Sequence, residues 1–160
     1  MPRAARWFCL SAVVIVLDYL SKTAVLRAFA PGESRLLTEF FNLVLVFNKG
    51  AAFSFLAGAQ GWQTLFFAAI AVVASLIIGF LIVRNKDKAL FCTGLALILG
   101  GALGNLYDRM VYGHVVDFLD FHAAGWHFPA FNVADSAITV GAGLLIVESF
   151  LQKQSHETPA

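Results

Sequence analysis

The feature of this sequence that most constrains its fold is the stretch from Trp62 to Val83, which is apolar and contains no charged residue. A helix needs about 20 mostly apolar residues to cross the hydrocarbon core of a bilayer, and this stretch is long enough. The stretch from Ala89 to Leu106 nearly reaches the same length. Only 13% of the residues are charged, whereas a soluble domain carries about a quarter. We therefore expect the chain to cross a membrane.

Two more stretches have the length of a membrane span but contain ionisable groups. Residues 7–26 include Asp18 and Lys22, and residues 131–150 include Asp135 and Glu148. The sequence thus predicts one membrane domain over residues 1–160, with four spans at about 7–26, 62–83, 89–106 and 131–150.

The first span also has features of a secretory signal peptide, because Ala28-Phe29-Ala30 has the pattern of a cleavage site. We expect this span to remain uncleaved. Its apolar run is long for a signal peptide, Asp18 and Lys22 interrupt it, and Pro31 would follow the cut.

The distribution of lysine and arginine predicts the orientation. The segments 1–6, 84–88 and 152–160 hold six basic residues in 20 positions, whereas the segments 27–61 and 107–130 hold four in 59. Because short cytoplasmic loops are rich in Lys and Arg, both termini are expected in the cytoplasm. The loops 27–61 and 107–130 are then extracytoplasmic.

The two long loops have distinct compositions. Residues 40–47 are rich in β-formers and lie between Pro31-Gly32 and Lys49-Gly50, which predicts a short sheet at the membrane surface. The second loop mixes aromatic residues with Asp and His, as an interfacial loop or helix does. The predicted fold is an all-α polytopic membrane protein of four transmembrane helices with a small extracytoplasmic β-sheet. Gly100, Gly101 and Gly104 are expected to serve helix packing.

Polar residues gather on one predicted side of the membrane. Charged groups within spans are costly and are therefore functional candidates. The group on the extracytoplasmic side comprises Asp18, Lys22, Asn48, Lys49, Asn105, Asp108, Arg109, Asp117, Asn132 and Asp135.

Several of these residues also have a purely structural interpretation. Asp18 and Lys22 are spaced i, i+4 and are expected to neutralise each other on one helix face. Asp108 and Arg109 could form an ion pair that ends the third span. Asn48 and Asn132 could be turn or cap residues, and Glu148 is expected to lie near Lys153 at the interface.

Asp117 and Asp135 are the candidate catalytic pair. Two carboxyl groups that meet in an apolar site cannot both ionise easily, so one keeps a proton while the other can activate water. Such a pair hydrolyses an amide by general acid–base catalysis, provided that the fold brings the two residues together. Zinc binding by His114, His122 and His127 is disfavoured, because their spacing fits no short zinc motif.

Five blocks of sequence carry a resemblance to a known family. They are Asp18 with Lys22, Asn48-Lys49-Gly50-Ala51-Ala52-Phe53-Ser54, Gly104-Asn105-Leu106-Tyr107-Asp108-Arg109, Gly113-His114-Val115-Val116-Asp117-Phe118, and Phe128-Pro129-Ala130-Phe131-Asn132-Val133-Ala134-Asp135. In this order, from about Asp18 to Gly141, the chain resembles lipoprotein signal peptidase, also called signal peptidase II.

The resemblance implies a membrane aspartyl endopeptidase that removes the signal peptide from diacylglyceryl-modified prolipoproteins, just before the lipidated cysteine. Asp117 and Asp135 match the family's catalytic pair. The matching substrate-binding or supporting positions are Asn48, Gly50, Asn105, Asp108, Arg109, Asn132, Asp18 and Lys22. The resemblance implies no metal or organic cofactor, and it implies that the antibiotic globomycin occupies the site. It places the protein in the bacterial cytoplasmic (inner) membrane, and we expect a monomer.

Three other functions remain as alternatives. The first is a small proton- or cation-coupled transporter that uses the intramembrane carboxylates, although these are expected at one face only. The others are a non-catalytic assembly subunit and a lipid-modifying transferase. The net charge of +1 gives no basic surface for nucleic acid.

Overall fold

The structure is a computed structural model that describes residues 3–50 and 62–157, with side chains described as far as Gln152. Within these residues the elements are α1 (Ala5–Ala28), β1 (Ser34–Thr38), β2 (Phe41–Asn48), α2 (Trp62–Arg84), α3 (Ala89–Tyr112), β3 (Val115–Ala123), β4 (Trp126–His127) and α4 (Val133–Glu157). The part of the second block from Ala51 to Ser54 lies outside the described residues.

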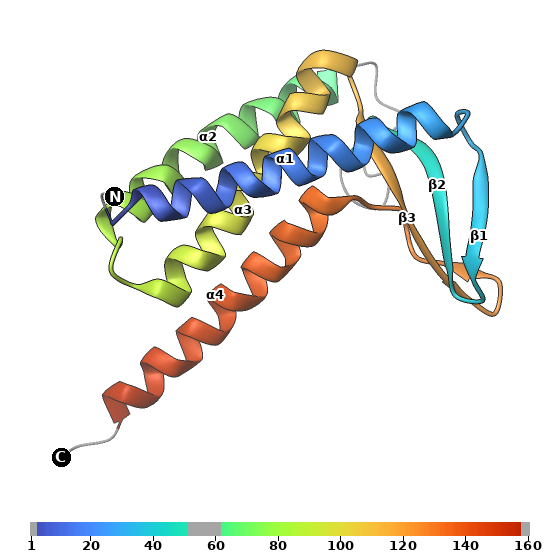
Figure 1. The fold of residues 1–160 in the computed structure, drawn as a ribbon. Coiled ribbons are helices and arrows are strands. Elements are labelled where there is room, and N and C mark those ends of the chain that lie inside the picture. The colour runs from blue at the N-terminus through green and yellow to red at the C-terminus, as the bar shows by residue number, and fades with distance from the viewer. Residues whose placement is uncertain (1–2, 51–61, 158–160) are drawn as a thin grey trace.

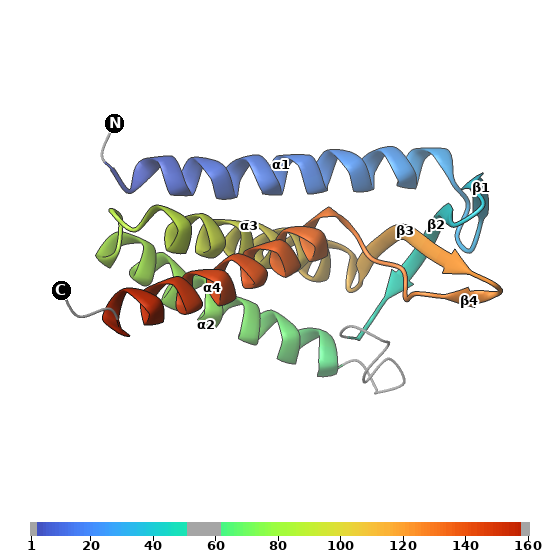
Figure 2. The ribbon, with the colours of Figure 1, turned by 90° about the horizontal axis from the view of Figure 1, so that it is seen from below.

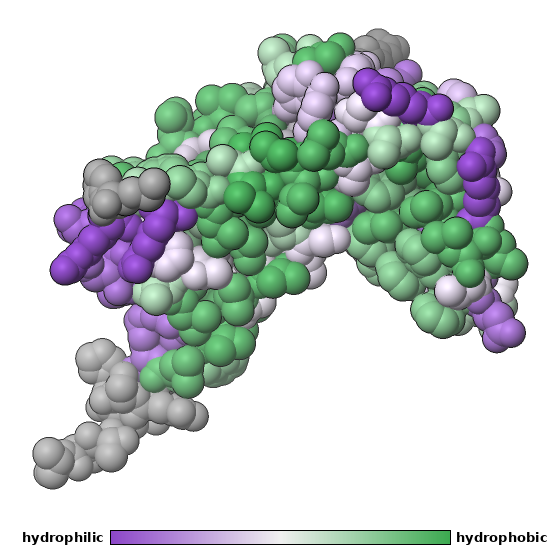
Figure 3. Space-filling view, in the orientation of Figure 1, coloured by the Kyte–Doolittle hydropathy of each residue, from purple (hydrophilic) through white to green (hydrophobic). Residues whose placement is uncertain are grey.

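The four helices form a bundle with α3 at its centre (Figures 1 and 2). Helix α3 packs against each of the other three helices, and 50% of its most apolar stretch is buried, compared with 11% for α2 and α4. All four are long and apolar enough to cross a membrane. Apolar side chains cover the helix flanks in Figure 3, and hydrophilic ones gather toward the two ends of the bundle. The chain is thus a multi-pass membrane protein, as predicted.

Close helix packing depends on glycine in α3 and α4. A Cβ atom at Gly141 would lie 2.6 Å from the carbonyl oxygen of Gly94, so α3 and α4 can approach only because both residues lack a side chain. A Cβ atom at Gly100 would lie 2.7 Å from Val14 of α1, and one at Gly104 would lie 2.7 Å from the carboxylate of Asp18. The packing role expected for these glycines is confirmed.

The sheet lies at the end of the bundle opposite the start of α1 and the end of α4 (Figures 1 and 2). Its strands are antiparallel in the order β1-β2-β3-β4. A bulge between Leu43 and Val46 separates two paired stretches of β2 and β3. Leu45, Val116 and Phe118 pack with Val25 near the end of α1, which attaches the sheet to the bundle.

The second loop differs from the expected interfacial loop or helix because it contributes two strands. Helix α3 continues to Tyr112 and ends at Gly113, whose φ of 75° is left-handed, as is common at helix C-termini. The chain then runs as β3 alongside β2. The predicted small sheet is therefore built from both loops, and its third strand carries Asp117.

Candidate active site

Asp135 lies in the first turn of α4 and is held there by Asn132, which precedes the helix. The side-chain oxygen of Asn132 accepts from the backbone N–H of Asp135 at 2.9 Å, and the backbone N–H of Asn132 donates to Asp135 Oδ2 at 3.3 Å. These reciprocal bonds form a capping box. Because the N–H groups at a helix N-terminus favour negative charge, the position suits an ionised carboxylate.

Asp117 lies on β3 opposite Val46, with only 2% of the residue exposed. Its Oδ1 accepts from Asn132 Nδ2 at 2.7 Å, and its Oδ2 accepts from Asn48 Nδ2 at 3.0 Å. Burial and the nearby Asp135 carboxylate raise the pKa of Asp117 to about 7, although the two hydrogen bonds oppose this shift. Asp117 therefore holds a proton much more readily than an ordinary aspartate does.

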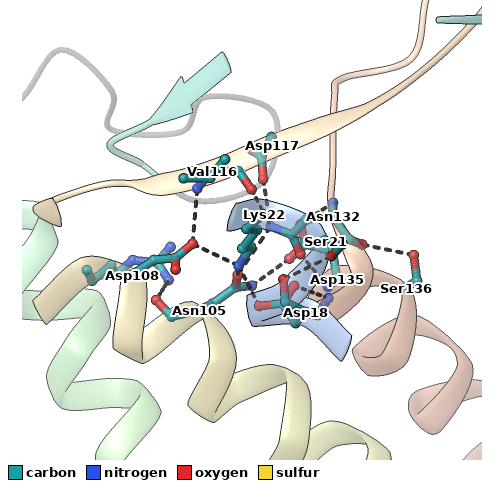
Figure 4. Close-up of polar contacts among 12 residues, drawn as sticks. Asp18, Ser21, Lys22, Asn105, Asp108, Val116, Asp117, Asn132, Asp135 and Ser136 are labelled. Atoms are coloured by element: carbon teal, nitrogen blue, oxygen red, sulfur yellow. Dashed lines mark hydrogen bonds and ion pairs between the residues drawn. The ribbon is translucent and has the colours of Figure 1, made fainter. Parts of the chain in front are cut away.

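Two asparagine side chains connect the carboxyl groups, as Figure 4 shows. Asn132 contacts Asp117 through its side chain and Asp135 through its backbone. Asn105 of α3 donates from Nδ2 to Asp135 Oδ1 at 2.8 Å, and its Oδ1 accepts from Asn132 Nδ2 at 3.2 Å. Each carboxylate oxygen of the two aspartates thus faces an N–H donor. Residues separated by 18 positions in sequence are joined at one site.

A buried ion-pair cluster lies beside the aspartates. Lys22 Nζ is 2.7 Å from Asp18 Oδ2 and 2.8 Å from Asp108 Oδ2. Asp18 Oδ1 also accepts from the backbone N–H of Ala134 at 2.9 Å, and Asp108 Oδ2 accepts from the backbone N–H of Val116 at 3.1 Å. The cluster therefore connects α1 and α3 to the residues that directly precede Asp135 and Asp117.

The ion pair between Asp108 and Arg109, considered as one structural alternative, is replaced by other contacts. Asp108 pairs with Lys22, whereas Arg109 donates to the carbonyl oxygens of Asn105 at 3.2 Å and Gly50 at 3.1 Å. The reason is geometric: adjacent residues on a helix point in different directions. The backbone N–H of Gly50 donates to Asn48 Oδ1 at 2.9 Å, so the turn role considered as the structural alternative for Asn48 coexists with its bond to Asp117.

The two aspartates line a cavity of about 740 Å³ between the sheet, the segment 128–131, α3 and α4. Its polar groups include Asn48, Arg109, Asp117 and Asp135, and most of the remaining wall is apolar. The volume falls within the range of roughly 300–1,000 Å³ that is usual for ligand pockets. Val140 of α4 lines the cavity and is 56% exposed. The cavity therefore borders the apolar surface of the bundle.

The three histidines considered as metal ligands do not gather at one point. His114 packs against Phe47 with 4.3 Å between ring centroids, whereas His122 and His127 stack on each other in the outer part of the sheet. In the part of the chain that the structure describes, no cluster of three or more His, Cys, Asp or Glu residues could hold a metal ion.

A second polar cluster surrounds Asp120 and was not among the predicted site residues. Asp120 accepts from Asn42 at 2.9 Å and lies 2.9 Å from His127 Nδ1, while His122 contacts Asn42 Oδ1 at 3.2 Å. Burial alone would raise the pKa of Asp120, but the bonds from Asn42 and His127 lower it below the ordinary value. The cluster joins β2, β3 and β4 away from the cavity.

The predicted site residues form one connected network. Hydrogen bonds or ion pairs link Asp18, Lys22, Asn48, Gly50, Asn105, Asp108, Arg109, Asp117, Asn132 and Asp135. Glu148 is not part of this network and accepts a hydrogen bond from Gln152 at 2.8 Å. The side chain of Lys153, its expected neighbour, lies outside the described residues.

Comparisons with known proteins agree on one family. The model of the signal peptidase (SPase) II family matches residues 10–151. A lipoprotein signal peptidase of Burkholderia multivorans is 61% identical over 144 residues, which cover 90% of this chain and 87% of that protein. One of Burkholderia ambifaria is 59% identical with the same coverage.

Solved structures with the same fold are also bacterial membrane enzymes. One, determined by the in meso method, has a TM-score of 0.85 at 28% identity and covers 98% of this chain and 93% of its own. A second has a TM-score of 0.78 at 29% identity, with 90% and 92% covered. From the family match and the curated relatives, we conclude that this chain belongs to the signal peptidase II family.

Proposed function

We propose that the protein is a metal-independent aspartic endopeptidase that removes signal peptides from diacylglyceryl-modified prolipoproteins, cutting just before the lipidated cysteine. The observation that carries this proposal is the arrangement of Asp117 and Asp135. Both line one cavity, and N–H donors face all four of their carboxylate oxygens. The family and the names of the relatives support the same substrate class.

The surroundings of the two aspartates support different roles for them. Asp135, at a helix N-terminus, is the ionised member and takes a proton from the attacking water. Asp117, whose raised pKa of about 7 favours the protonated form, donates to the scissile carbonyl oxygen. When the tetrahedral intermediate collapses, the C–N bond breaks, the proton on Asp135 passes to the leaving amine, and one hydroxyl group of the intermediate returns its proton to Asp117 as the carbonyl reforms. The pair then returns to its singly protonated state.

A position at the outer membrane interface suits this substrate. Moving acyl chains out of the bilayer costs about 0.8 kcal/mol per methylene, so the enzyme must act at the membrane. The five basic residues Arg3, Arg6, Arg84, Lys86 and Lys88 belong to the end of the bundle away from the sheet. This charge supports cytoplasmic termini and an extracytoplasmic active site in the bacterial inner membrane. We propose that the protein acts there as a monomer.

The backbone of β2 offers a means of holding an extended peptide. Its pairing with β1 ends at Val44, whereas Val46, Phe47 and Asn48 pair with β3 and line the cavity. A substrate strand could pair with β2 beyond Val44, on the side opposite β3. It would then be held through backbone hydrogen bonds, with little dependence on its side chains. Such binding accounts for processing of many different signal peptides by one site.

A transporter is the alternative function. It would need carboxylates along the depth of the membrane, but Asp18, Asp108, Asp117 and Asp135 lie together near the sheet. Neither the family match nor the relatives support transport.

The experiment that tests the substrate class compares two precursors with the purified protein in lipid. One carries the diacylglyceryl-modified cysteine, and its matched control has serine at that position and cannot be modified. We expect cleavage of the lipidated precursor only, with inhibition by globomycin. Equal cleavage of both precursors would rule out the proposed lipid requirement. Cation flux in vesicles without any cleavage would favour the transporter.

A further inference from the structure

The ammonium group of Lys22 donates to three buried acceptors. Its Nζ contacts Asp18 Oδ2 at 2.7 Å, Asp108 Oδ2 at 2.8 Å and Asn105 Oδ1 at 3.0 Å. An ammonium group has three N–H bonds, so these contacts satisfy it completely. The Lys22 side chain is only 3% exposed. Lys22 pairs with the carboxylates of Asp18 in α1 and Asp108 in α3. It also interacts over a longer distance with the charges of the Asp117 and Asp135 carboxylates.

The contact with Asn105 determines which end of that amide faces the active site. An ammonium group can only donate, so the amide end that faces Lys22 must be the oxygen. The same oxygen accepts from Asn132 Nδ2 at 3.2 Å. The amide nitrogen is therefore directed at Asp135, to which it donates at 2.8 Å. If the amide turned over, an oxygen would face the Asp135 carboxylate and repel its ionised form.

We propose that Lys22 is a positioning residue for the aspartate pair, acting through Asn105. Its ammonium group fixes the Asn105 amide with the donor toward Asp135, and thereby favours the ionised form of that aspartate. This inference rests on the proposed peptidase function and adds to it. Lys22 thereby helps to keep Asp135 ionised while Asp117 holds the proton, in addition to linking α1 with α3.

A purely structural role for Lys22 makes a different prediction. A buried ion pair is often no more stabilising than neutral groups of similar size, although loss of one partner alone is damaging. If Lys22 served only to neutralise Asp18 and Asp108, removing one charge of each sign would lower stability through the unpaired Asp108 but would leave kcat and the pH profile of the folded protein unchanged. If it orients Asn105, the same change would impair catalysis in a folded protein.

The test uses the charge-balanced variant Asp18→Asn/Lys22→Met, which leaves the net charge of the cluster unchanged. Asn at position 18 keeps an oxygen that can accept from Ala134. Arg27→Met, which removes an exposed basic residue of the same helix, is the matched control. Activity on the lipidated precursor is measured against pH, and thermal unfolding in detergent shows whether each variant is folded.

We expect the charge-balanced variant to fold and its kcat to fall about ten- to a hundredfold, the effect of one hydrogen bond to a charged group. Its KM should change little, and the acidic limb of the pH profile should move to higher pH. Adding the double substitution to Asn105→Ala should lower kcat by no more than about twofold, because coupled residues are not additive. Arg27→Met should behave as the wild type.

Several results would overturn the inference while leaving the peptidase intact. One is a charge-balanced variant that keeps the wild-type kcat and pH profile. Another is a charge-balanced double substitution that lowers kcat by its full factor even in the Asn105→Ala background. The third is a charge-balanced variant that does not fold. Failure of the wild type itself to cleave the lipidated precursor is distinguishable from these, since it would remove the proposed function.

Discussion

The environment of Asp117 combines burial, a second carboxylate and two amide donors. The first two raise its pKa to about 7, so the aspartate titrates near neutral pH. Below that pH Asp117 keeps the proton that the mechanism requires, and above it the proton is lost. We therefore expect kcat/KM to decline as the pH rises through about 7, in a titration that belongs to the coupled pair. A profile that stays level to pH 9 would contradict this role.

Asn48 provides a way to move that titration. Its hydrogen bond to Asp117 lowers the pKa of the carboxyl group, so Asn48→Ala should raise the pKa and shift the basic limb of kcat/KM to higher pH. The activity at the optimum should also fall, because the carboxyl group loses one of its two orienting contacts. An unchanged or downward shift of the limb would show that Asn48 does not act on Asp117.

At single residues, short-range contacts were more predictable from the sequence than long-range ones. The i, i+4 pair of Asp18 and Lys22 is confirmed, and Asn132 caps α4 as its position suggested. The contact of Lys22 with Asn105 spans 83 positions, and no local pattern could indicate it. The Asn-x-x-Asp spacing of Asn132 and Asp135 was a usable signal for a capping box.

At the scale of elements, α3 and α4 depend on the absence of side chains where their backbones meet. Gly141→Ala should destabilise the protein by about 1–3 kcal/mol, as overpacking usually does, because the new methyl group would lie 2.6 Å from the Gly94 oxygen. The measurement is the thermal unfolding midpoint in detergent.

Gly143→Ala is the matched control for this substitution. Both glycines belong to α4, but a Cβ atom at Gly143 has no neighbour within 4 Å. This variant should unfold at the wild-type temperature or slightly above it, because alanine favours the helix. Equal destabilisation by the two variants would show that contact between α3 and α4 is not the cause.

The helices were predictable from sequence because their apolar length alone indicates membrane spans. The strands were less so. β3 alternates polar and apolar residues only in part, and its partner β2 precedes it by about 70 positions, with α2 and α3 between them. Pairing of such distant segments depends on how the bundle brings the two loops together. Local composition does not contain that information.

For the whole molecule, the proposed orientation places the two ends of the bundle on opposite sides of the membrane. In a variant with Cys9 and Cys92 replaced by alanine, Glu39→Cys introduces a thiol in the exposed turn between β1 and β2. Asp87→Cys introduces one between α2 and α3. The reagent is a thiol label that does not cross the cytoplasmic membrane, applied to cells whose outer envelope has been made permeable to it. It should label position 39 directly, and position 87 only after the cytoplasmic membrane has been disrupted. The reverse pattern would place the active site in the cytoplasm.

In the proposed mechanism, Asp117 and Asp135 together hydrolyse the peptide bond of a lipidated precursor without a metal. The most direct measurement compares purified wild type, Asp117→Asn and Asp135→Asn on the diacylglyceryl-modified prolipoprotein, with a chelator present and with unfolding curves for each protein. We predict cleavage by the wild type and a loss of at least about a hundredfold in each folded variant, as expected for removal of a general acid or base. Full activity in either folded variant, or dependence of the wild type on added metal, would contradict the account.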